Sequence, residues 1–359
     1  MAKREVSRRE FVRDSALAAA AVAAGLSAAR AGEPDKTKIL SYNENMEYRR
    51  LGKTGWMVSA VCLGGHWKRV RTIVPDCNCD GWTGDVTHAG FQKNRAEVVS
   101  RCIERGVNYI DACSPCEVMA YAKALEGRRE RMHLGFSWCD KELRNAQYRT
   151  AKALLQALEE GLREAKLDYV DLWRVTMDQD SHNHPRPVVE EMIQALETAK
   201  KQGKARAIGL SSHDRPHIKL MIETFPQIEV VVTPYHARTR ELPQDSLFDA
   251  VRKCDVGVFG IKPFASNSLF KGNSALDSPS ADEDDRLARL AIRYILGNPA
   301  ITAPIPGLIN THQVDNVAEA IQERRKLDRA EARELDRAME RAWANLPAGY
   351  QFLKDWERV

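Results

Sequence analysis

The alternation of short apolar segments with helix-forming segments constrains the fold of this chain more than any other feature. Helical spacing is clearest over residues 151–165 and 188–199, where apolar residues recur every three or four positions. Eight segments of strand type occupy residues 58–63, 107–111, 132–138, 170–175, 205–210, 228–233, 256–263 and 301–306, and a helix-forming segment follows each of them. Short connections of this kind require parallel strand pairing. The pattern therefore predicts an α/β fold, a (β/α)8 TIM barrel.

An open, doubly wound parallel sheet is the alternative to the barrel. Sheets of that type that bind dinucleotides have a G-x-G-x-x-G turn after a strand, and the sequence has no such turn. We expect the barrel and a C-terminal helix to span residues 47–346, between a linker over residues 32–46 and a tail over residues 347–359. In a barrel the functional site lies at the carboxyl ends of the strands.

The first 31 residues have the form of an export signal. Residues 7–13 (SRREFVR) resemble the twin-arginine motif, and the Ala-rich run over residues 16–26 is too short to span a bilayer. Residues 29–31 (ARA) have the form of a signal peptidase site. We therefore expect a twin-arginine signal peptide over residues 1–31, the twin-arginine export machinery as a partner, and a periplasmic or otherwise exported protein of a bacterium. The alternative is an Ala-rich helical extension.

The charge of the chain is close to balanced outside this N-terminal segment. The full sequence has 54 Lys and Arg against 50 Asp and Glu, a net charge of +4, and residues 1–31 contribute six of the basic and three of the acidic residues. The remainder has no basic stripe interleaved with aromatic residues, and no later stretch has the length and apolarity of a membrane anchor. We expect a small-molecule substrate, no nucleic-acid partner and no stable membrane anchor.

Several motifs, in order along the chain, resemble those of one known family. They are YRRLGKTG at residues 48–55, GVNYID at residues 106–111, LDYVDL at residues 167–172, GKARAIGLS at residues 203–211, and Pro306-Gly307 followed by Gln313 and Asn316. Together they resemble the aldo-keto reductase superfamily over residues 48–325. The resemblance implies a (β/α)8 barrel which, in active members, reduces carbonyl groups with NADP or NAD.

The catalytic residues that the resemblance implies are mostly replaced in this chain. Active members use a tyrosine as the acid, a lysine that lowers the pKa of the tyrosine, an aspartate that pairs with the lysine, and a histidine that orients the substrate oxygen. The aspartate corresponds to Asp111, the tyrosine to Cys116, the lysine to Ser137 and the histidine to Thr176. These four are the candidate catalytic residues. Without the lysine, Asp111 is either an acid itself or part of a cap or another ion pair.

The cofactor pocket that the resemblance implies is also altered. The amide-binding asparagine of the family corresponds to Ser212, its glutamine to Val232, and the tyrosine that stacks on the nicotinamide to Ile261. Residues 308–310 are Leu, Ile and Asn, so no cation for a 2′-phosphate stands there. The candidate cofactor contacts are Ser211, Ser212, Lys262, Gly307, Gln313 and Asn316. Lys262 either faces the pyrophosphate or is a solvated side chain at a strand end.

Cysteines gather where the family's catalytic residues are lost. Three of the eight, Cys62, Cys102 and Cys254, fall within expected strands or helices and are interpreted as core residues. The other five map to the rim of the barrel and are Cys77, Cys79, Cys113, Cys116 and Cys139. Four interpretations stay open for them: disulfides, a redox pair at Cys113 and Cys116, unpaired thiols, and a metal or cluster. The metal ligands would be Cys113, Cys116 and Cys139, with His66, His213 or His236.

Three functions follow from these observations. The first is an exported oxidoreductase of the aldo-keto reductase type, which acts on a carbonyl or alcohol with a nicotinamide cofactor but without the usual Tyr, Lys and His. The second is a cysteine- or metal-dependent enzyme on the same barrel. The third is a catalytically inactive barrel that binds a small molecule.

Overall fold

The computed structural model describes residues 35–79, 84–177 and 180–355. The expected signal peptide over residues 1–31 and the start of the expected linker lie outside the described residues. Residues 1–38 form a unit of their own, of which the short 3-10 helix η1 (Lys36–Lys38) is described. The second unit, Ile39–Val359, contains the strands and helices of the barrel.

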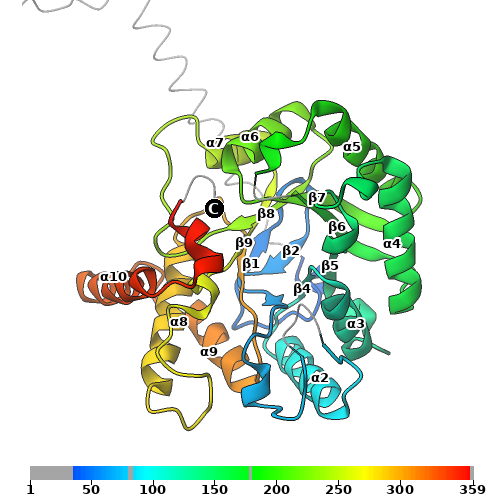
Figure 1. The fold of residues 1–359 in the computed structure, drawn as a ribbon. Coiled ribbons are helices and arrows are strands. Elements are labelled where there is room, and N and C mark those ends of the chain that lie inside the picture. Colours follow the sequence, from blue (N-terminus) through cyan, green and yellow to red (C-terminus); the bar gives the residue numbers. More distant parts are fainter. Residues whose placement is uncertain (1–34, 80–83, 178–179, 356–359) are drawn as a thin grey trace, which may run out of the picture. The chain divides into compact units, whose positions relative to one another are not determined.

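Eight parallel strands form the barrel that the sequence predicts (Figure 1). In order they are β3 (Leu63–Gly64), β4 (Tyr109–Ala112), β5 (His133–Phe136), β6 (Val170–Thr176), β7 (Ala205–Ser211), β8 (Val230–Pro234), β9 (Gly257–Ile261) and β10 (Ala303–Ile305). Each pairs with the next in the chain, and a parallel bridge between Gly64 and Gly307 joins the first strand to the last segment. The strands are short and almost wholly buried, as expected where helices cover the sheet.

Helices surround the strands (Figure 1). They are α2 (Ala89–Glu104), α3 (Pro115–Ala124), α4 (Ala151–Ala165), α5 (Arg186–Lys201), α6 (Arg215–Thr224), α7 (Leu247–Cys254), α8 (Ala281–Leu296), α9 (Thr311–Gln322) and α10 (Arg329–Ala344). Short 3-10 turns are η2 (Gly52–Thr54), η3 (Val70–Thr72), η4 (Arg129–Arg131), η5 (Cys139–Lys141), η6 (Ala146–Tyr148), η7 (Ser181–Asn183), η8 (Ala265–Asn267) and η9 (Ala348–Lys354). No helix in the described ranges is long and apolar enough to cross a membrane.

The helices begin where the sequence supplies capping side chains. Ser114 accepts a hydrogen bond from the amide of Glu117 and Pro115 opens the first turn, so α3 starts directly after β4. Asn310 caps α9 in the same way. In α4, the apolar side chains that recur at helical spacing are the buried ones, including Leu154, Leu158 and Leu162. These starts place the first turns of the helices at the carboxyl ends of the strands.

The first barrel strand differs from its predicted position. The sequence predicts one strand over residues 58–63, but the structure divides this segment. A hairpin of β1 (Tyr48–Arg50) and β2 (Met57–Ser59) turns through residues 51–56, and the barrel strand itself is the short β3. The reason is packing, because Leu51 and Val58 lie in the core inside the barrel with Tyr109 and Phe259. The hairpin thus fills the amino-terminal end of the barrel and leaves the opposite end for a site.

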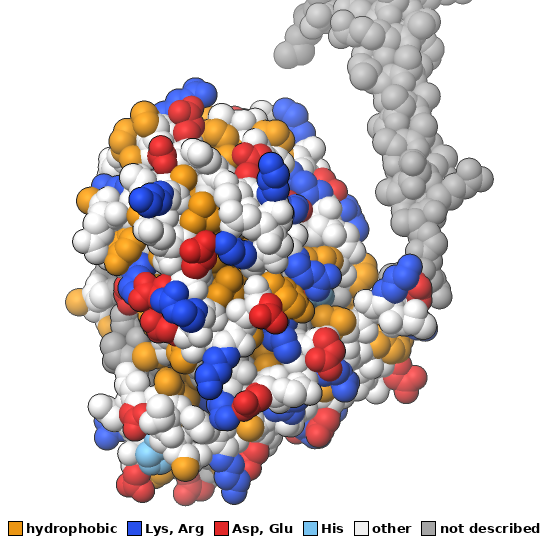
Figure 2. Space-filling view, turned by 90° about the vertical axis from the view of Figure 1, so that its right-hand side faces the viewer, with side chains coloured by type: hydrophobic (Ala, Val, Ile, Leu, Met, Phe, Trp, Pro, Cys, Tyr) orange, Lys and Arg blue, Asp and Glu red, His pale blue; other side chains and the backbone are white. Residues whose placement is uncertain are grey.

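The chain returns to the barrel mouth after α10. The sequence predicts a tail over residues 347–359, yet η9, within the described part of that segment, lies against the loops at the carboxyl ends of the strands. The Phe352 ring stacks on His213 with 5.0 Å between ring centroids, and Tyr350 lines the cavity described below. Elsewhere on the surface, acidic and basic side chains are interspersed on the face seen in Figure 2.

Candidate active site

A cavity of about 180 Å³ opens at the carboxyl ends of the barrel strands. Its walls come from six strands and the segments that follow them. The polar side chains in it are His66, Lys68, Asp111, Cys113, Glu117, Arg144, Arg174, Thr176, Ser211, Lys262, Ser266, Asn267 and Tyr350. A site of this kind, assembled from the ends of several strands, is where barrel enzymes carry out their chemistry.

Asp111 is held by an arginine at the bottom of this cavity. Arg174, from β6, donates from Nη2 to Oδ2 of Asp111 at 2.5 Å and from Nε to Oδ1 at 2.9 Å. Both side chains are almost fully buried. Burial alone would lower the pKa of Arg174, but the charge and hydrogen bonds of Asp111 raise it well above its usual value. Asp111 is therefore not an unpaired acid, and the ion-pair alternative from the sequence is confirmed.

A buried network fixes Thr176 beside this pair. Its hydroxyl lies 2.7 Å from the Ser137 hydroxyl and accepts from Arg174 Nη1 at 3.1 Å. Glu142 accepts from the Ser137 hydroxyl at 2.7 Å and from the amide of Thr176 at 2.6 Å. Burial raises the pKa of Glu142. Thr176 lines the cavity, whereas Ser137 is fully buried behind it.

His66, Cys113 and Glu117 form a compact cluster on one wall. The Nδ1 atom of His66 lies 2.6 Å from Glu117 Oε1, and the Cys113 sulfur lies 3.8 Å from Nδ1 and 4.0 Å from Nε2. Burial would raise the pKa of Glu117, but His66 and two backbone amides lower it. Burial would lower the pKa of His66, but the charges of Cys113 and Glu117 raise it well above its usual value. Each group is thus held by the other two.

Two lysines, Lys262 and Lys68, line the same cavity. Lys262 follows β9, and none of the carboxylates in the described part of the chain pairs with its ammonium group; burial lowers its pKa to about 8. Lys262 and three residues just beyond it, Ala265, Ser266 and Asn267, have positive φ angles between 47° and 68°. Non-glycine residues rarely adopt this conformation, and it concentrates at functional sites. Lys68 contacts the hydroxyl of Ser266 in this loop and that of Tyr350 in η9.

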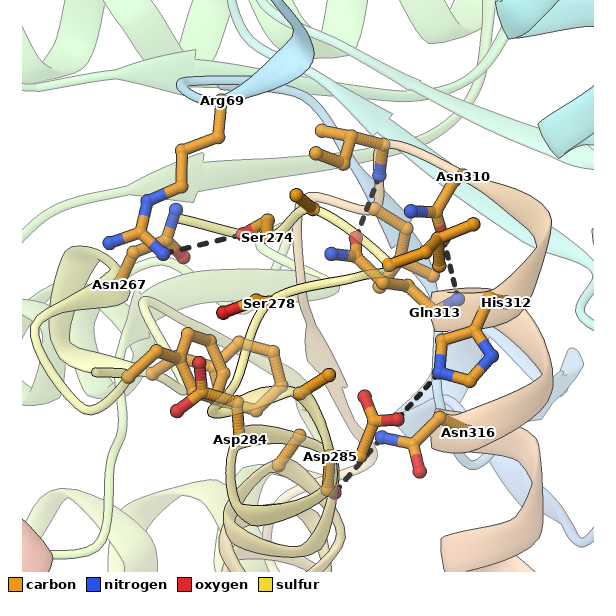
Figure 3. Close-up of a pocket in the computed structure, with 18 of the residues that line it drawn as sticks. Arg69, Asn267, Ser274, Ser278, Asp284, Asp285, Asn310, His312, Gln313 and Asn316 are labelled. Carbon is orange, nitrogen blue, oxygen red and sulfur yellow. Dashed lines mark hydrogen bonds and ion pairs between the residues drawn. The ribbon is translucent and has the colours of Figure 1, made fainter. Parts of the chain in front are cut away.

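A second, narrower cleft of about 70 Å³ continues from the first between α8 and α9 (Figure 3). The two share Lys68, Phe264, Asn267 and Gly307. Gln313 accepts from the amide of Ile309 at 2.9 Å, and Asn316 donates to the carbonyl of Asp285 at 3.0 Å. The side-chain nitrogen of Asn310, by contrast, is buried without a hydrogen-bond partner.

The family of this chain follows from a comparison with models of protein families. A model described as "Aldo/keto reductase family" matches residues 84–340. The chain belongs to the aldo/keto reductase family. The match confirms the resemblance seen in the sequence, and it covers the strands and helices from α2 to α10.

Known proteins similar to this aldo/keto reductase family member are distant in sequence. L-galactose dehydrogenase of Arabidopsis thaliana is 21% identical over 308 residues, covering 77% of this chain and 89% of the relative. The 6-dehydroglucose reductase of Novosphingobium aromaticivorans is 23% identical over 303 residues, covering 77% and 91%. Among solved structures, an aldo-keto reductase from Bacillus halodurans in its holo form aligns with a TM-score of 0.59 at 21% identity, covering 82% of this chain and 96% of that one. An aldo-keto reductase from Klebsiella pneumoniae in complex with NADPH aligns with a TM-score of 0.59 at 18% identity, covering 81% and 94%. The solved structures establish the same fold.

Of the candidate catalytic residues, not all reach the cavity of this family member. Asp111 and Thr176 line it, but Cys116 does not; its sulfur lies 3.8 Å from the carbonyl of Gly84. Among the candidate cofactor contacts, Ser211 and Lys262 line the first cleft, Gln313 and Asn316 the second, and Gly307 both. Ser212 instead hydrogen-bonds to Ser181 at 2.7 Å and lines neither cleft.

The rim cysteines do not converge as a ligand set. Cys113, Cys116 and Cys139 were one expected metal triad, but in the described ranges the group of three ligand-type side chains that comes together is His66, Cys113 and Glu117. The reason is that Cys116 turns away on the first turn of α3 while Cys139 is buried in η5, where burial raises the pKa of its thiol. All eight cysteines are free thiols in the structure, so it contains none of the expected disulfides.

Two residues at the centre of the site, Arg174 and Glu117, were given no role from the sequence. Arg174 is a charged residue within an apolar strand segment, which is a signal, since a buried charge requires a partner. Glu117 follows Cys116 in the first turn of a helix, where acidic residues are common for capping alone, so its sequence position gave no comparable indication.

Proposed function

We propose that the protein is an exported oxidoreductase that transfers hydride between a nicotinamide cofactor, NADP or NAD, and a carbonyl or alcohol group of a small molecule. The observation that supports this best is the continuity of the two clefts, from the Asp111–Arg174 pair at the barrel mouth to the start of α9. A long ligand with a reactive head and a distant tail fits such a trough. The dehydrogenase and reductase names of two relatives, and the NADPH complex of a structural neighbour, agree with the same chemistry.

The residues in the trough fit a dinucleotide. Lys262 supplies a cation without an acidic partner among the described residues, and Asn310 a buried donor without an acceptor. A pyrophosphate and an adenine or ribose group are the parts of the cofactor that would satisfy them. We assign Lys262 to the phosphates, Ser211 to the nicotinamide end, and Gly307, Gln313 and Asn316 to the adenosine end. When bound, the nicotinamide supplies or accepts the hydride.

The substrate oxygen is positioned by Arg174 in this proposal. Asp111 and Thr176 hold the guanidinium in one orientation, and its remaining N–H groups are free to donate toward the cavity. A fixed donor of this kind stabilises the negative charge that develops on the oxygen as hydride reaches the carbon. Burial strengthens the interaction, because water does not compete for the same donors. The family's tyrosine is not needed for this part of the work.

Calorimetric titration of the purified protein with NADPH and with NADH tests the proposal. Binding of either cofactor at micromolar concentration is expected, with Lys262→Ala weakening it by about 10-fold through the lost phosphate contact. Lys253→Ala, a change at the exposed end of α7, is the matched control and leaves the affinity unchanged. The absence of heat with both cofactors up to millimolar concentration would exclude the oxidoreductase function and favour a barrel that binds another small molecule.

Export rests on the motif at residues 7–13 and has its own test. Residues 1–35 fused to a folded fluorescent reporter are expected to direct it to the periplasm of a bacterium that has the twin-arginine machinery. Replacing Arg8 and Arg9 together by Lys should keep the reporter in the cytoplasm. A reporter that stays in the cytoplasm with the unchanged segment would support the alternative of an Ala-rich extension.

A further inference from the structure

We propose that His66, Cys113 and Glu117 bind one transition-metal ion, zinc by the chemistry of the donors, with an open position toward the cavity. One imidazole, one thiol and one carboxylate come together from three segments: His66 follows β3, Cys113 follows β4, and Glu117 lies in the first turn of α3. Their donor atoms lie within 4.8 Å of one another. A nitrogen, a sulfur and a carboxylate oxygen are ligands that zinc accepts in tetrahedral sites.

The separations between the donor atoms fit a tetrahedral ion. With metal–ligand distances of about 2.0 Å for nitrogen and oxygen and about 2.3 Å for sulfur, neighbouring donors lie about 3.3–3.6 Å apart. The sulfur of Cys113 and Nδ1 of His66 are 3.8 Å apart, close to that value. Nδ1 and Glu117 Oε1 are 2.6 Å apart, a hydrogen-bond distance. Replacing the shared proton by an ion requires these two atoms to separate by less than about 1 Å.

The surroundings orient the carboxylate before any ion arrives. Glu117 is 1% exposed and accepts from the backbone amides of His66 at 2.6 Å and Cys113 at 2.7 Å. Gly65 packs directly on it, since a Cβ at that position would lie 2.0 Å from the carboxyl carbon. His66 itself has a φ of 57°, a conformation that directs its ring to the cluster at a cost in backbone energy. Hydrogen bonds to ligating carboxylates are a recurrent feature of metal sites.

The charges balance around a divalent ion. A thiolate and a carboxylate together neutralise it, and neighbouring Asp111 and Arg174 already neutralise each other. Lys262, which lines the same cavity, is then left for an anionic part of a ligand. His66, Cys113 and Glu117 all line the cavity, so the fourth coordination position faces the space where a substrate would lie.

The role of the ion rests on the proposed function. A carbonyl oxygen at the open position would be polarised by the metal. Hydride from the dihydronicotinamide forms the new C–H bond, the π electrons of the carbonyl move to the oxygen, and solvent supplies the proton that completes the alcohol. The cofactor leaves oxidised by two electrons and the substrate is reduced by two. A metal would thereby replace the acid that is missing at Cys116.

Metal binding is measured without reference to activity. The full-length protein is treated with chelator, dialysed, and titrated with Zn²⁺ and separately with Co²⁺. We expect one zinc per chain by mass spectrometry, and a thiolate-to-cobalt charge-transfer band in the near ultraviolet. Cys113→Ser should abolish the band and weaken zinc binding by about 100-fold or more. Cys139→Ser and Cys254→Ser are matched controls that keep both signals.

Two outcomes would overturn the site: less than about 0.1 zinc per chain in the unchanged protein, or a Cys113→Ser variant that keeps the full zinc content and the band. Glu117→Gln is a second ligand variant. Because it removes a buried charge, the fold of this variant is checked by circular dichroism. If the variant does not fold, His66→Gln replaces it. Cofactor titration is independent of these readouts. If the protein binds zinc but neither NADPH nor NADH, the metal site is supported and the oxidoreductase proposal fails. If it binds a cofactor but no zinc, only the metal site is overturned.

Discussion

Two buried aspartates, one at each end of the barrel, both form ion pairs with arginines, but the two ion pairs have different roles. Asp171 lies near the start of β6, where it pairs with Arg129 at 2.7 Å and Arg206 at 2.9 Å and also accepts from the amide of Leu134. Asp111, at the opposite end, has one arginine, Arg174. At the amino-terminal end of the barrel, several cations surround the carboxylate of Asp171. At the mouth a single cation is oriented by the carboxylate and still faces a cavity.

The difference teaches where a barrel can use a buried charge for function. A carboxylate with all its acceptor sites taken, like Asp171, contributes to stability and leaves nothing for a ligand. Within the described ranges, the acceptors of the Arg174 guanidinium are Asp111 and Thr176, which leave further N–H groups for a ligand in the cavity that Arg174 lines. This agrees with the general division of barrels into a base that stabilises and a mouth that reacts.

Asp171→Asn should produce the largest loss of stability. The substitution leaves Arg129, Arg206 and His133 around a neutral amide, and breaking a buried ion pair in this way costs about 3–5 kcal/mol. Urea unfolding at neutral pH measures the loss. Asp255→Asn, which breaks an exposed pair with Arg50, is the control and should cost less than about 1 kcal/mol. If Asp171→Asn lowered the unfolding free energy as little as the control does, the stabilising role of the Asp171 ion pairs would be contradicted.

Arg174→Lys should have the next largest effect, on turnover. Lysine keeps the charge but cannot form the two-point contact with Asp111 and orient a second donor, so we expect kcat to fall by about 100-fold. The unfolding free energy should fall by less than that of Asp171→Asn, because the pair remains.

The double variant Asp111→Asn/Arg174→Met separates the two roles of the pair. Removing both charges should return most of the stability that is lost when Arg174 alone is removed, while turnover stays low. Recovery of turnover together with stability would show that the pair has only a structural role.

Asp171, at the amino-terminal end of the barrel, should make stability depend on pH. Burial would raise the pKa of Asp171, but His133, Arg129 and the backbone lower it well below its ordinary value of 3.8. Its folded pKa is depressed, so its contribution is complete above about pH 4 and is lost as the pH falls further. The difference in unfolding free energy between the unchanged protein and Asp171→Asn should therefore shrink below pH 4, by up to about 1.4 kcal/mol per pH unit. A constant difference down to pH 2 would contradict the depressed pKa.

The fold was predictable because strands and helices differ in the period of their apolar residues. The predicted strand over residues 58–63 was wrong in position because apolar residues run across the hairpin and the barrel strand without a break. The local pattern does not indicate that Val58 belongs to a hairpin and packs inside the barrel, because its position depends on the space that the closed barrel leaves in its interior.

The site was predictable where a residue lies at a strand end and not where it depends on contacts between segments. Thr176 ends its strand, Asp111 is one residue from the end of its own, and the structure places both in the cavity. The partner of Asp111 was missed because Arg174 comes from a different strand, two positions before Thr176. Cys116 was assigned to the site by the family resemblance, but its side chain, on the first turn of α3, does not line the cavity.

Ser137→Ala should have the smallest effect, and it tests how far the mouth extends. The hydroxyl joins Glu142 to Thr176 behind the cavity wall, so its loss removes two buried hydrogen bonds at about 1 kcal/mol each. Thr176 stays held by its own backbone amide on Glu142 and by Arg174, and kcat should change by less than about twofold. Unfolding and steady-state kinetics on the same sample separate the two quantities. A fall in kcat beyond about tenfold at unchanged stability would place Ser137 within the reactive part of the mouth, and the boundary between the supporting network and the site would then lie at Glu142.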